Sequence, residues 1–276
     1  PEDVTAAGEK SLAEALAARD YPKALSSIIN MSLAQSAISA DRLPAQIDRI
    51  EKLRDESSDP AFKALLNSLL ARIYSDVYND DRWKYDGRDL PLTPLPEDYT
   101  LWSGEQFKHH IASLVNLSLA DADALKKIPL REWAGPVAVD NASLVYYPTL
   151  YDFIASSAID RLEICLPNDW FLSFGLLTRS DVYVTRRLNA SSPEITKILS
   201  LYADLLRFHE NDVAPFIHTD IARIDFVADH VYADDESDNV STRRQQLMMD
   251  LYDRFRDSEY SGDVLNEMPI GSYSDV

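Results

Sequence analysis

The histidines are the residues of this chain whose type and spacing first suggest metal chemistry. His109 and His110 are neighbours in a segment with helical periodicity, where adjacent side chains point about 100° apart. We therefore expect no shared metal ion, which a pair at positions i and i+4 would hold, and predict a surface or interface role. His209 opens the sequence His-Glu-Asn-Asp-Val, in which Val213 stands where a zinc protease requires its second histidine. We predict instead that His209 is a hydrogen-bonded histidine of the core.

An acidic segment, Asp234-Asp235-Glu236-Ser237-Asp238, raises the question of calcium binding. A calcium-binding EF-hand loop needs glycine at its sixth position and glutamate at its twelfth. Counted from Asp234, these positions hold Asn239 and Gln245. We therefore predict an acidic loop between two helices, with no metal site.

The motifs of nucleophilic and phosphate chemistry are missing. The sequence has no Gly-x-Ser-x-Gly elbow and no glycine-rich phosphate loop, and it has only 7 glycines in total. Cys165 is the single cysteine, which excludes an internal disulfide and a cysteine zinc site. We predict a protein that is not an enzyme and holds no cofactor. A hydrolase with paired carboxylates is a minor alternative, because spacing alone cannot select a pair from 46 acidic residues.

Aromatic residues concentrate in the middle third of the chain and form the candidate partner or ligand surface. Tyrosine and tryptophan suit either internal packing or an interface, because they bury a large ring while a polar atom needs a partner. Both interpretations stay open from the sequence. The candidate surface residues are Trp83, Tyr85, Trp102, Trp133, Tyr146 and Tyr147.

The elements that would position these residues are predicted to be helices. In residues 59–80, Phe62, Leu66, Leu69 and Ile73 repeat at helical spacing, and Asp59 precedes a first-turn proline. The same periodicity occurs in residues 22–39, 193–209, 214–231 and 242–257, and a Ser103-x-x-Gln106 capping box opens a further helix over residues 103–119.

Two stretches interrupt this pattern. Residues 86–102 contain three prolines and form a predicted connector between an N-terminal helical part, residues 1–85, and a second part, residues 103–276. Residues 165–192 form an irregular insert, apolar enough to pack on the helices, with a short strand predicted at residues 182–185. Because no fixed repeat length holds, we expect an all-α fold of irregular, tetratricopeptide-like helical repeats or an α-α superhelix.

Composition limits the classes of partner. The formal net charge is −19, from 27 basic and 46 acidic residues, so binding to nucleic acid or to anionic lipid is disfavoured. No apolar run is long enough to span a bilayer. The chain starts at Pro1 rather than methionine, which we take as a sign of trimming that fits a removed export signal.

Several motifs, spread over about residues 65–260, also occur in order in one known family. They are Arg82-Trp83-Lys84-Tyr85, Leu125-x-x-Ile128-Pro129-Leu130, Tyr147-Pro148-Thr149-Leu150-Tyr151-Asp152-Phe153-Ile154-Ala155 and Leu201-Tyr202-x-x-Leu205-Leu206-x-Phe208-His209. In these motifs the chain resembles the N-terminal region of large alpha-2-macroglobulin-like proteins of Bacteroidetes. The resemblance implies a tetratricopeptide-like helical region in an exported, periplasmic or outer-membrane-associated protein, often a lipoprotein, of a protease-trapping family. The family's thioester motif does not match around Cys165, and no bait region can be placed on this chain.

The combined expectation is a non-catalytic helical scaffold or protein-docking module at the N-terminus of such an envelope protein. Its partner would be another protein or the rest of its own longer chain, with no nucleic acid and no direct membrane span. The alternative is a free-standing periplasmic or surface module that binds a glycan or peptide in a groove formed by the central aromatic residues.

Overall fold

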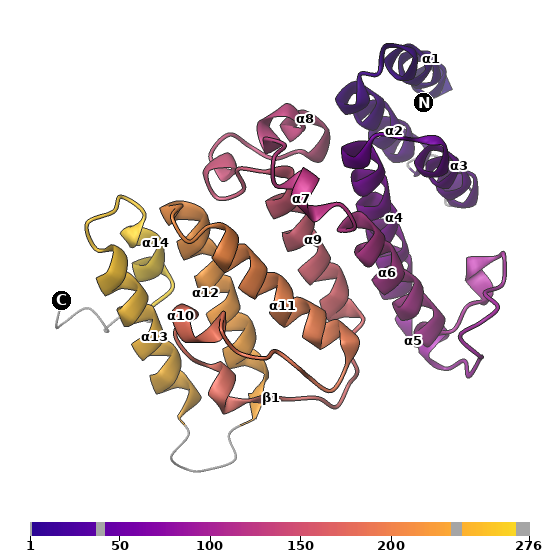
Figure 1. Cartoon of the computed structure of the whole chain (residues 1–276). Helices are drawn as coiled ribbons and strands as arrows, with labels where there is room; N and C mark the ends of the chain where they lie inside the picture. The colour runs from indigo at the N-terminus through magenta and orange to yellow at the C-terminus, as the bar shows by residue number, and fades with distance from the viewer. Residues whose placement is uncertain (1, 37–41, 233–238, 269–276) are drawn as a thin grey trace. The chain divides into compact units, whose positions relative to one another are not determined.

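Helices make up most of the chain in the computed structural model, which describes residues 2–36, 42–232 and 239–268 (Figure 1). The all-α prediction is therefore confirmed, whereas the tetratricopeptide-like repeat and the superhelix stay predictions. Internal contacts divide the chain into two units, Pro1–Cys165 and Leu166–Val276. Among the described residues, no helix is both long and apolar enough to cross a lipid bilayer.

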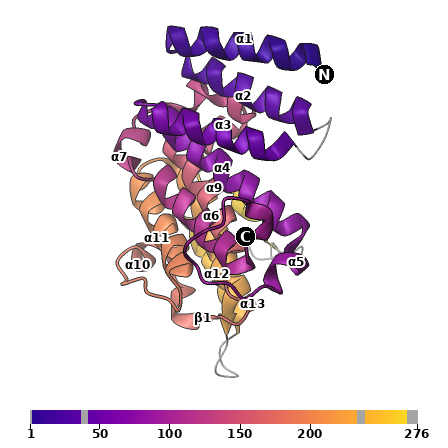
Figure 2. The same ribbon diagram turned by 90° about the vertical axis from the view of Figure 1, so that its right-hand side faces the viewer.

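The first unit consists of successive helices packed side by side. Its helices are α1 (Glu2–Ala18), α2 (Tyr21–Ser36), α3 (Leu43–Glu56), α4 (Pro60–Asp80), α5 (Arg82–Asp86), α6 (Gly104–Ser118), α7 (Ala122–Leu125), α8 (Ala134–Val137) and α9 (Leu150–Ile164). Figure 2 shows α1, α2 and α3 stacked one on the next. Helix α4 is central, because it packs against α3, α6 and α9.

Local sequence explains why α4 forms and which face it buries. The Asp59 carboxylate accepts a hydrogen bond of 2.8 Å from the Phe62 backbone N–H, and Pro60 occupies the first turn. Phe62, Leu66 and Leu70 then repeat at a spacing of four residues and are each at most 1% exposed. The predicted helix start is confirmed. Of the predicted stripe, Phe62 and Leu66 are buried, whereas Leu69 and Ile73 are half-buried.

Two capping boxes begin the helices that pack on α4. In α6, the Ser103 N–H donates to Gln106 Oε1 at 2.9 Å, and the Gln106 N–H donates to Ser103 Oγ at 3.2 Å. In α9, the backbone N–H of Thr149 donates to Asp152 Oδ2 at 2.7 Å. The sequence predicted the first of these boxes.

The proline-rich connector lies inside the first unit, which differs from the predicted division after residue 85. Helix α4 precedes the connector and α6 follows it, yet these two helices pack along each other. The connector is therefore a loop that leads the chain from α5 back to α6, which packs along α4. The boundary between the units falls after Cys165 instead.

The second unit contains five α-helices, one short 3-10 helix and a two-stranded parallel sheet among its described residues. The elements are β1 (Leu172–Ser173), α10 (Ser180–Tyr183), α11 (Pro193–Phe208), α12 (Val213–His230), β2 (Val231–Tyr232), α13 (Val240–Phe255) and α14 (Ser261–Asn266). Leu172 pairs with Val231, and Ser173 pairs with Tyr232. Helix α12 packs against both α11 and α13. The acidic segment at residues 234–238 lies outside the described residues.

The strand predicted at residues 182–185 is wrong, because this stretch is helix α10 followed by hydrogen-bonded turns. Val182 is 40% exposed and has no strand beside it, whereas the fully buried Tyr183 donates its hydroxyl to the Leu199 carbonyl at 2.9 Å. The wider prediction, that the irregular insert packs onto helices, holds for Trp170, which stacks on Phe226 of α12, and for Tyr183, but not for Phe171, which is 67% exposed.

Candidate functional site

The six candidate aromatic residues do not share one surface. Tyr85, Trp102 and Trp133 are 3%, 4% and 5% exposed, so their rings belong to the core and cannot face a ligand. Tyr146 and Tyr147 are half-buried. Trp83 alone among the six is largely open to solvent, at 80% exposure. The structure therefore favours internal packing for most of this set.

Tyr85 and Trp102 are buried because an aromatic cluster fills the space between α4, α6 and the connector. Trp102 stacks on Tyr74 with ring centroids 5.3 Å apart, and Phe107 lies 5.1 Å from Trp102 and 4.6 Å from Tyr85. The indole N–H of Trp102 donates to the Pro96 carbonyl at 2.7 Å. The polar atom of the ring is thus satisfied by the connector itself.

The two adjacent histidines lie in different environments, which corrects the shared surface role predicted for them. His109 is exposed. The ring of His110 packs in the aromatic cluster, 4.6 Å from Tyr74 and 5.0 Å from Trp102. Burial lowers the pKa of His110 to about 4, because the cluster cannot solvate the charged imidazolium.

The prediction for His209 is confirmed. This residue is 1% exposed, and its Nδ1 lies 3.2 Å from Asp212 Oδ2. Across the part of the chain that the structure describes, no group of three or more His, Cys, Asp or Glu side chains is placed to hold a metal ion.

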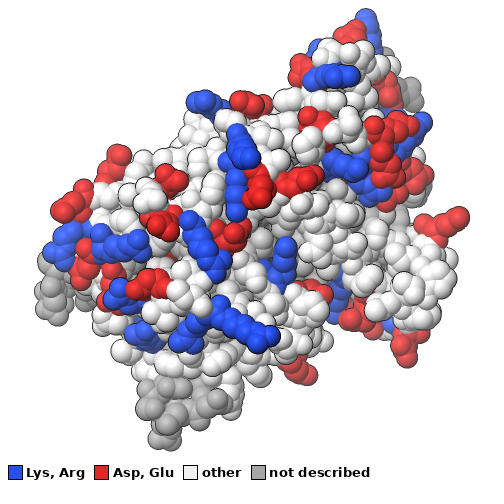
Figure 3. All heavy atoms as spheres, viewed as in Figure 1, with Lys and Arg blue, Asp and Glu red and all other residues white. Residues whose placement is uncertain are grey.

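Exposed apolar side chains gather on and beside the connector. We call Trp83, Leu90, Leu92 and Leu101 the connector surface; their exposures are 80%, 40%, 45% and 56%. In Figure 3 the part of this face that lies over α5 and the connector, at the lower right, is mostly free of charged atoms, which appear at its margins. Four exposed acidic residues of the same stretch, Asp86, Asp89, Glu97 and Asp98, border these apolar side chains in the sequence.

Two polar side chains hold the connector in place. Arg88 Nη1 donates to the carbonyls of Thr100 and Trp102 at 2.6 and 2.8 Å, which closes the connector across its base. Gln106 Nε2 donates to the Pro91 carbonyl at 2.7 Å and so fixes the turn between the two exposed leucines, Leu90 and Leu92. The apolar side chains are therefore carried by an anchored backbone.

The first unit also has an open pocket of about 420 Å³ next to α9. Its wall includes an ion pair of 3.6 Å between Arg161 and Asp76. Nearby, burial raises the pKa of the Asp160 carboxyl. Tyr147, one of the six candidate aromatic residues, borders this pocket.

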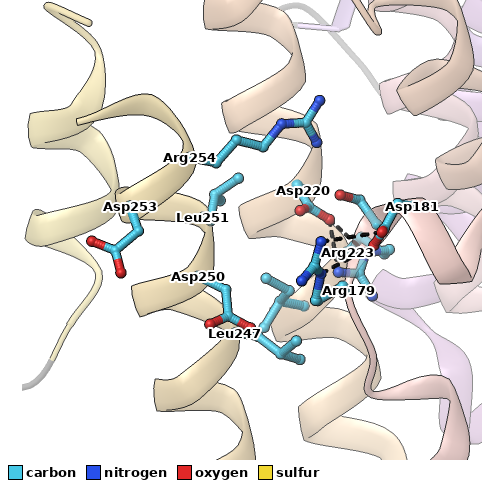
Figure 4. A pocket seen from close by; sticks show the side chains of 11 residues that line it. Arg179, Asp181, Asp220, Arg223, Leu247, Asp250, Leu251, Asp253 and Arg254 are labelled. Carbon is cyan, nitrogen blue, oxygen red and sulfur yellow. Dashed lines mark hydrogen bonds and ion pairs between the residues drawn. The ribbon is translucent and has the colours of Figure 1, made fainter. Parts of the chain in front are cut away.

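The second unit has a smaller pocket, of about 340 Å³, between α10, α12 and α13 (Figure 4). Helix α12 contributes Asp220 and Arg223, and α13 contributes Leu247 and Asp250. Three arginines and four aspartates line it in all. The lining is thus rich in charges of both signs.

Arg223 is the unusual residue of this pocket, because its side chain is 0% exposed. Its Nε donates to Asp220 Oδ1 at 2.7 Å, and its guanidinium carbon lies 4.7 Å from the centre of the Tyr183 ring. Nη2 lies 2.7 Å from the same Asp220 oxygen as an ion pair, but neither Nη atom makes a hydrogen bond among the described residues. Burying a guanidinium whose N–H groups make no hydrogen bond lowers the free energy of unfolding, unless another group accepts those hydrogen bonds.

Sequence reasoning missed Arg223 and its neighbours, although a signal was present. Asp220, Arg223, Ile224 and Val227 follow helical spacing, and all four are buried, so two charged residues stand on an apolar stripe. A buried charged pair on such a stripe is a mark of a functional or specificity role. Asp250, in contrast, comes from a separate helix and carries no local signal.

Comparison with protein-family models, with curated proteins and with solved structures finds no match to this chain.

Proposed function

We propose that this chain is a non-catalytic helical scaffold that docks a protein partner through the connector surface. The observation that carries the proposal is the 80% exposure of Trp83, followed within 18 residues of sequence by three exposed leucines on an anchored connector. Single exposed apolar residues are ordinary, but several on one short segment mark interaction sites. Tryptophan is also the residue type most enriched among those that dominate binding energy at interfaces.

The anchoring of the connector favours docking over simple exposure. The hydrogen bonds of Arg88 and Gln106 hold the backbone in one conformation before a partner arrives. Binding then costs less conformational entropy than it would with a mobile loop. The chain's charge of −19 favours a partner that presents an apolar groove with a neutral or basic rim.

Photo-crosslinking tests the docking surface directly. A photo-reactive amino acid is placed at position 83 in the native host, and a matched variant carries it at position 117, where Leu117 is 51% exposed on α6. We expect one defined protein to be crosslinked from position 83 and not from position 117. Equal labelling from both positions, or none from position 83, would remove the proposal.

Once the partner is identified, Trp83→Ala measures how much the Trp83 side chain contributes to the affinity for that partner. We expect the affinity to fall by at least a factor of about 30, equivalent to about 2 kcal/mol, because a central interface tryptophan contributes this much. The free energy of unfolding should stay within about 0.5 kcal/mol of the original value, since Trp83 is exposed.

The resemblance to macroglobulin-like proteins supports a further part of this proposal, that the scaffold belongs to a large exported protein. An antibody against this chain, used on fractionated source cells, should detect a band far above 31.2 kDa in the envelope fraction. A band near 31.2 kDa would remove the macroglobulin part, while the docking surface would still be tested by the crosslinks.

A further inference from the structure

The pocket of the second unit contains a positive group that is prepared for an anion. Asp220 holds the Nε side of Arg223, and the Tyr183 ring covers one face of the guanidinium. These contacts fix the orientation of the side chain. Among the described residues neither Nη1 nor Nη2 makes a hydrogen bond, although Nη2 lies 2.7 Å from Asp220 Oδ1 as an ion pair. Two neighbouring N–H donors in a plane match the two oxygens of a carboxylate.

The opposite side of the pocket carries a carboxylate that has no cation. Asp250 is half-buried on α13 and accepts one neutral hydrogen bond, from Gln246 Nε2 at 2.9 Å. Within the described ranges it makes no ion pair, whereas Asp181 pairs with Arg179 and Asp253 pairs with Arg256. Asp250 is therefore the aspartate of this pocket that is available to a cationic group.

We propose that this pocket binds a small zwitterion, an apolar α-amino acid, with its carboxylate on Arg223 and its ammonium group on Asp250. The two groups stand on the facing helices α12 and α13, and Figure 4 shows their side chains on opposite sides of the same space. One ligand that carries both charges would satisfy the buried donors of Arg223 and the carboxylate of Asp250 together.

Charge argues for a zwitterion over a simple anion. The chain has a net charge of −19, and aspartates outnumber arginines around the pocket by four to three. This negative field would repel a dianion such as phosphate, whereas a zwitterion, which has no net charge, would not be repelled. Alternating charges on the pocket wall then complement the two ends of the ligand.

The size and the apolar part of the lining indicate the side chain of the ligand. The volume of about 340 Å³ falls at the lower end of the range for small-molecule sites, about 300–1,000 Å³. Ile224, Leu247 and Leu251 supply apolar wall between the charged groups. An aliphatic side chain of the size of leucine would bury its surface against them.

Calorimetric titration of the whole chain with three related probes tests the assignment. L-leucine carries both charges, N-acetyl-L-leucine lacks the ammonium group, and L-leucinamide lacks the carboxylate. We expect L-leucine to bind with a Kd of about 1 mM or tighter, and each analogue to bind at least about tenfold more weakly. Failure of L-leucine to bind, or binding of either analogue as tight as that of L-leucine, would overturn the proposal.

Variants then assign each end of the ligand. Asp250→Asn should weaken L-leucine at least about tenfold while leaving the weak affinity for N-acetyl-L-leucine unchanged. Asp257→Asn, an exposed change just after α13, removes the same charge away from the pocket and should have no effect. Unchanged binding of L-leucine by Asp250→Asn, or equal loss in both variants, would contradict the assigned contact.

Arg223→Met should abolish the binding of both carboxylate probes, L-leucine and N-acetyl-L-leucine. Circular dichroism establishes whether this variant is folded. If it unfolds, the comparison of Asp250→Asn with Asp257→Asn on the two probes still decides the proposal, because both of these aspartates lie outside the core. Retained binding of L-leucine by folded Arg223→Met would overturn the carboxylate contact.

Discussion

At the scale of single residues, His110 makes the stability of the first unit depend on pH. Its ring packs against Tyr74 and Trp102, and burial lowers its pKa to about 4, from the ordinary value of 6.5 for a histidine. Between these two values the unfolded chain binds a proton that the folded chain does not. The free energy of unfolding must therefore fall as the pH drops from 6.5 toward 4.

We predict that His110→Phe removes part of this pH dependence. Phenylalanine keeps an aromatic ring in the cluster but cannot take up a proton. Between pH 7 and pH 4.5, the loss in the free energy of unfolding should be about 2 kcal/mol smaller in the variant than in the original chain. This value allows for the partial contact of the His110 ring with solvent. Urea unfolding at the two pH values measures this difference.

His109→Gln is the matched control for this experiment, because His109 is the exposed neighbour on the same helix. It should show the same loss of stability on acidification as the original chain. If His110→Phe and His109→Gln behave alike, His110 is not neutral and buried in solution, and the aromatic cluster is open to solvent.

A second residue, Tyr183, holds the irregular segment of the second unit to a helix. Its hydroxyl donates to the Leu199 carbonyl at 2.9 Å, and the residue is fully buried. We predict that Tyr183→Phe lowers the free energy of unfolding by about 1 kcal/mol, because a buried carbonyl loses its side-chain donor while the ring packing is kept. Denaturant unfolding measures the change, and a value near zero would show that this bond contributes little.

At the scale of elements, the connector depends on Arg88. One guanidinium nitrogen bonds the carbonyls of Thr100 and Trp102, and the guanidinium carbon lies 5.3 Å from the centre of the Tyr85 ring. We predict that Arg88→Ala speeds amide hydrogen exchange in residues 88–102 by about tenfold or more. In the variant, local opening of the connector no longer requires the two hydrogen bonds of Arg88 to break. Mass spectrometry of peptic fragments would measure the exchange.

Exchange in α4 and α6 should stay unchanged in Arg88→Ala, since the packing between these helices does not pass through the arginine. Arg72→Ala serves as the comparison, because Arg72 makes a long, exposed ion pair of 3.7 Å with Asp76 on α4. Faster exchange throughout the first unit, instead of in the connector alone, would mean that the connector is part of the cooperative core.

The sequence was sufficient to predict elements whose signals are local. Asp59 with Pro60 and Ser103 with Gln106 each set a helix start within four residues, and both starts are found as predicted. The strand predicted at residues 182–185 is absent although Val182, Val184 and Thr185 are β-branched, because a tertiary hydrogen bond from Tyr183 to Leu199 holds this stretch in helix α10 and the turns after it.

The pocket could not have been predicted in the same way, because its parts are far apart in the sequence. Ser180, Arg223 and Asp250 come from α10, α12 and α13, and only the packing of these helices brings them together. In a chain with 46 acidic residues, Asp250 has no local mark that separates it from the others. Burial of Trp102 likewise depends on the carbonyl of Pro96, which the return of the connector supplies.

At the scale of the whole molecule, we predict that Pro1–Cys165 folds on its own. The buried residues of α4, such as Leu66 and Leu70, pack in a unit whose helices α3, α6 and α9 all lie within this range. A chain of about this length can bury enough apolar surface for an independent core. Expressed alone, residues 1–165 should give a helical circular dichroism spectrum and one cooperative thermal transition.

Residues 1–149 are the comparison for this fragment, because they end before α9 and leave the side of α4 that α9 covers open to water. This shorter fragment should lose the cooperative transition while keeping some helix. Without α9, the helices α4 and α6 lose the packing that stabilises them. A residue 1–165 fragment that melts as gradually as the shorter piece would show instead that the first unit requires Leu166–Val276 for its stability.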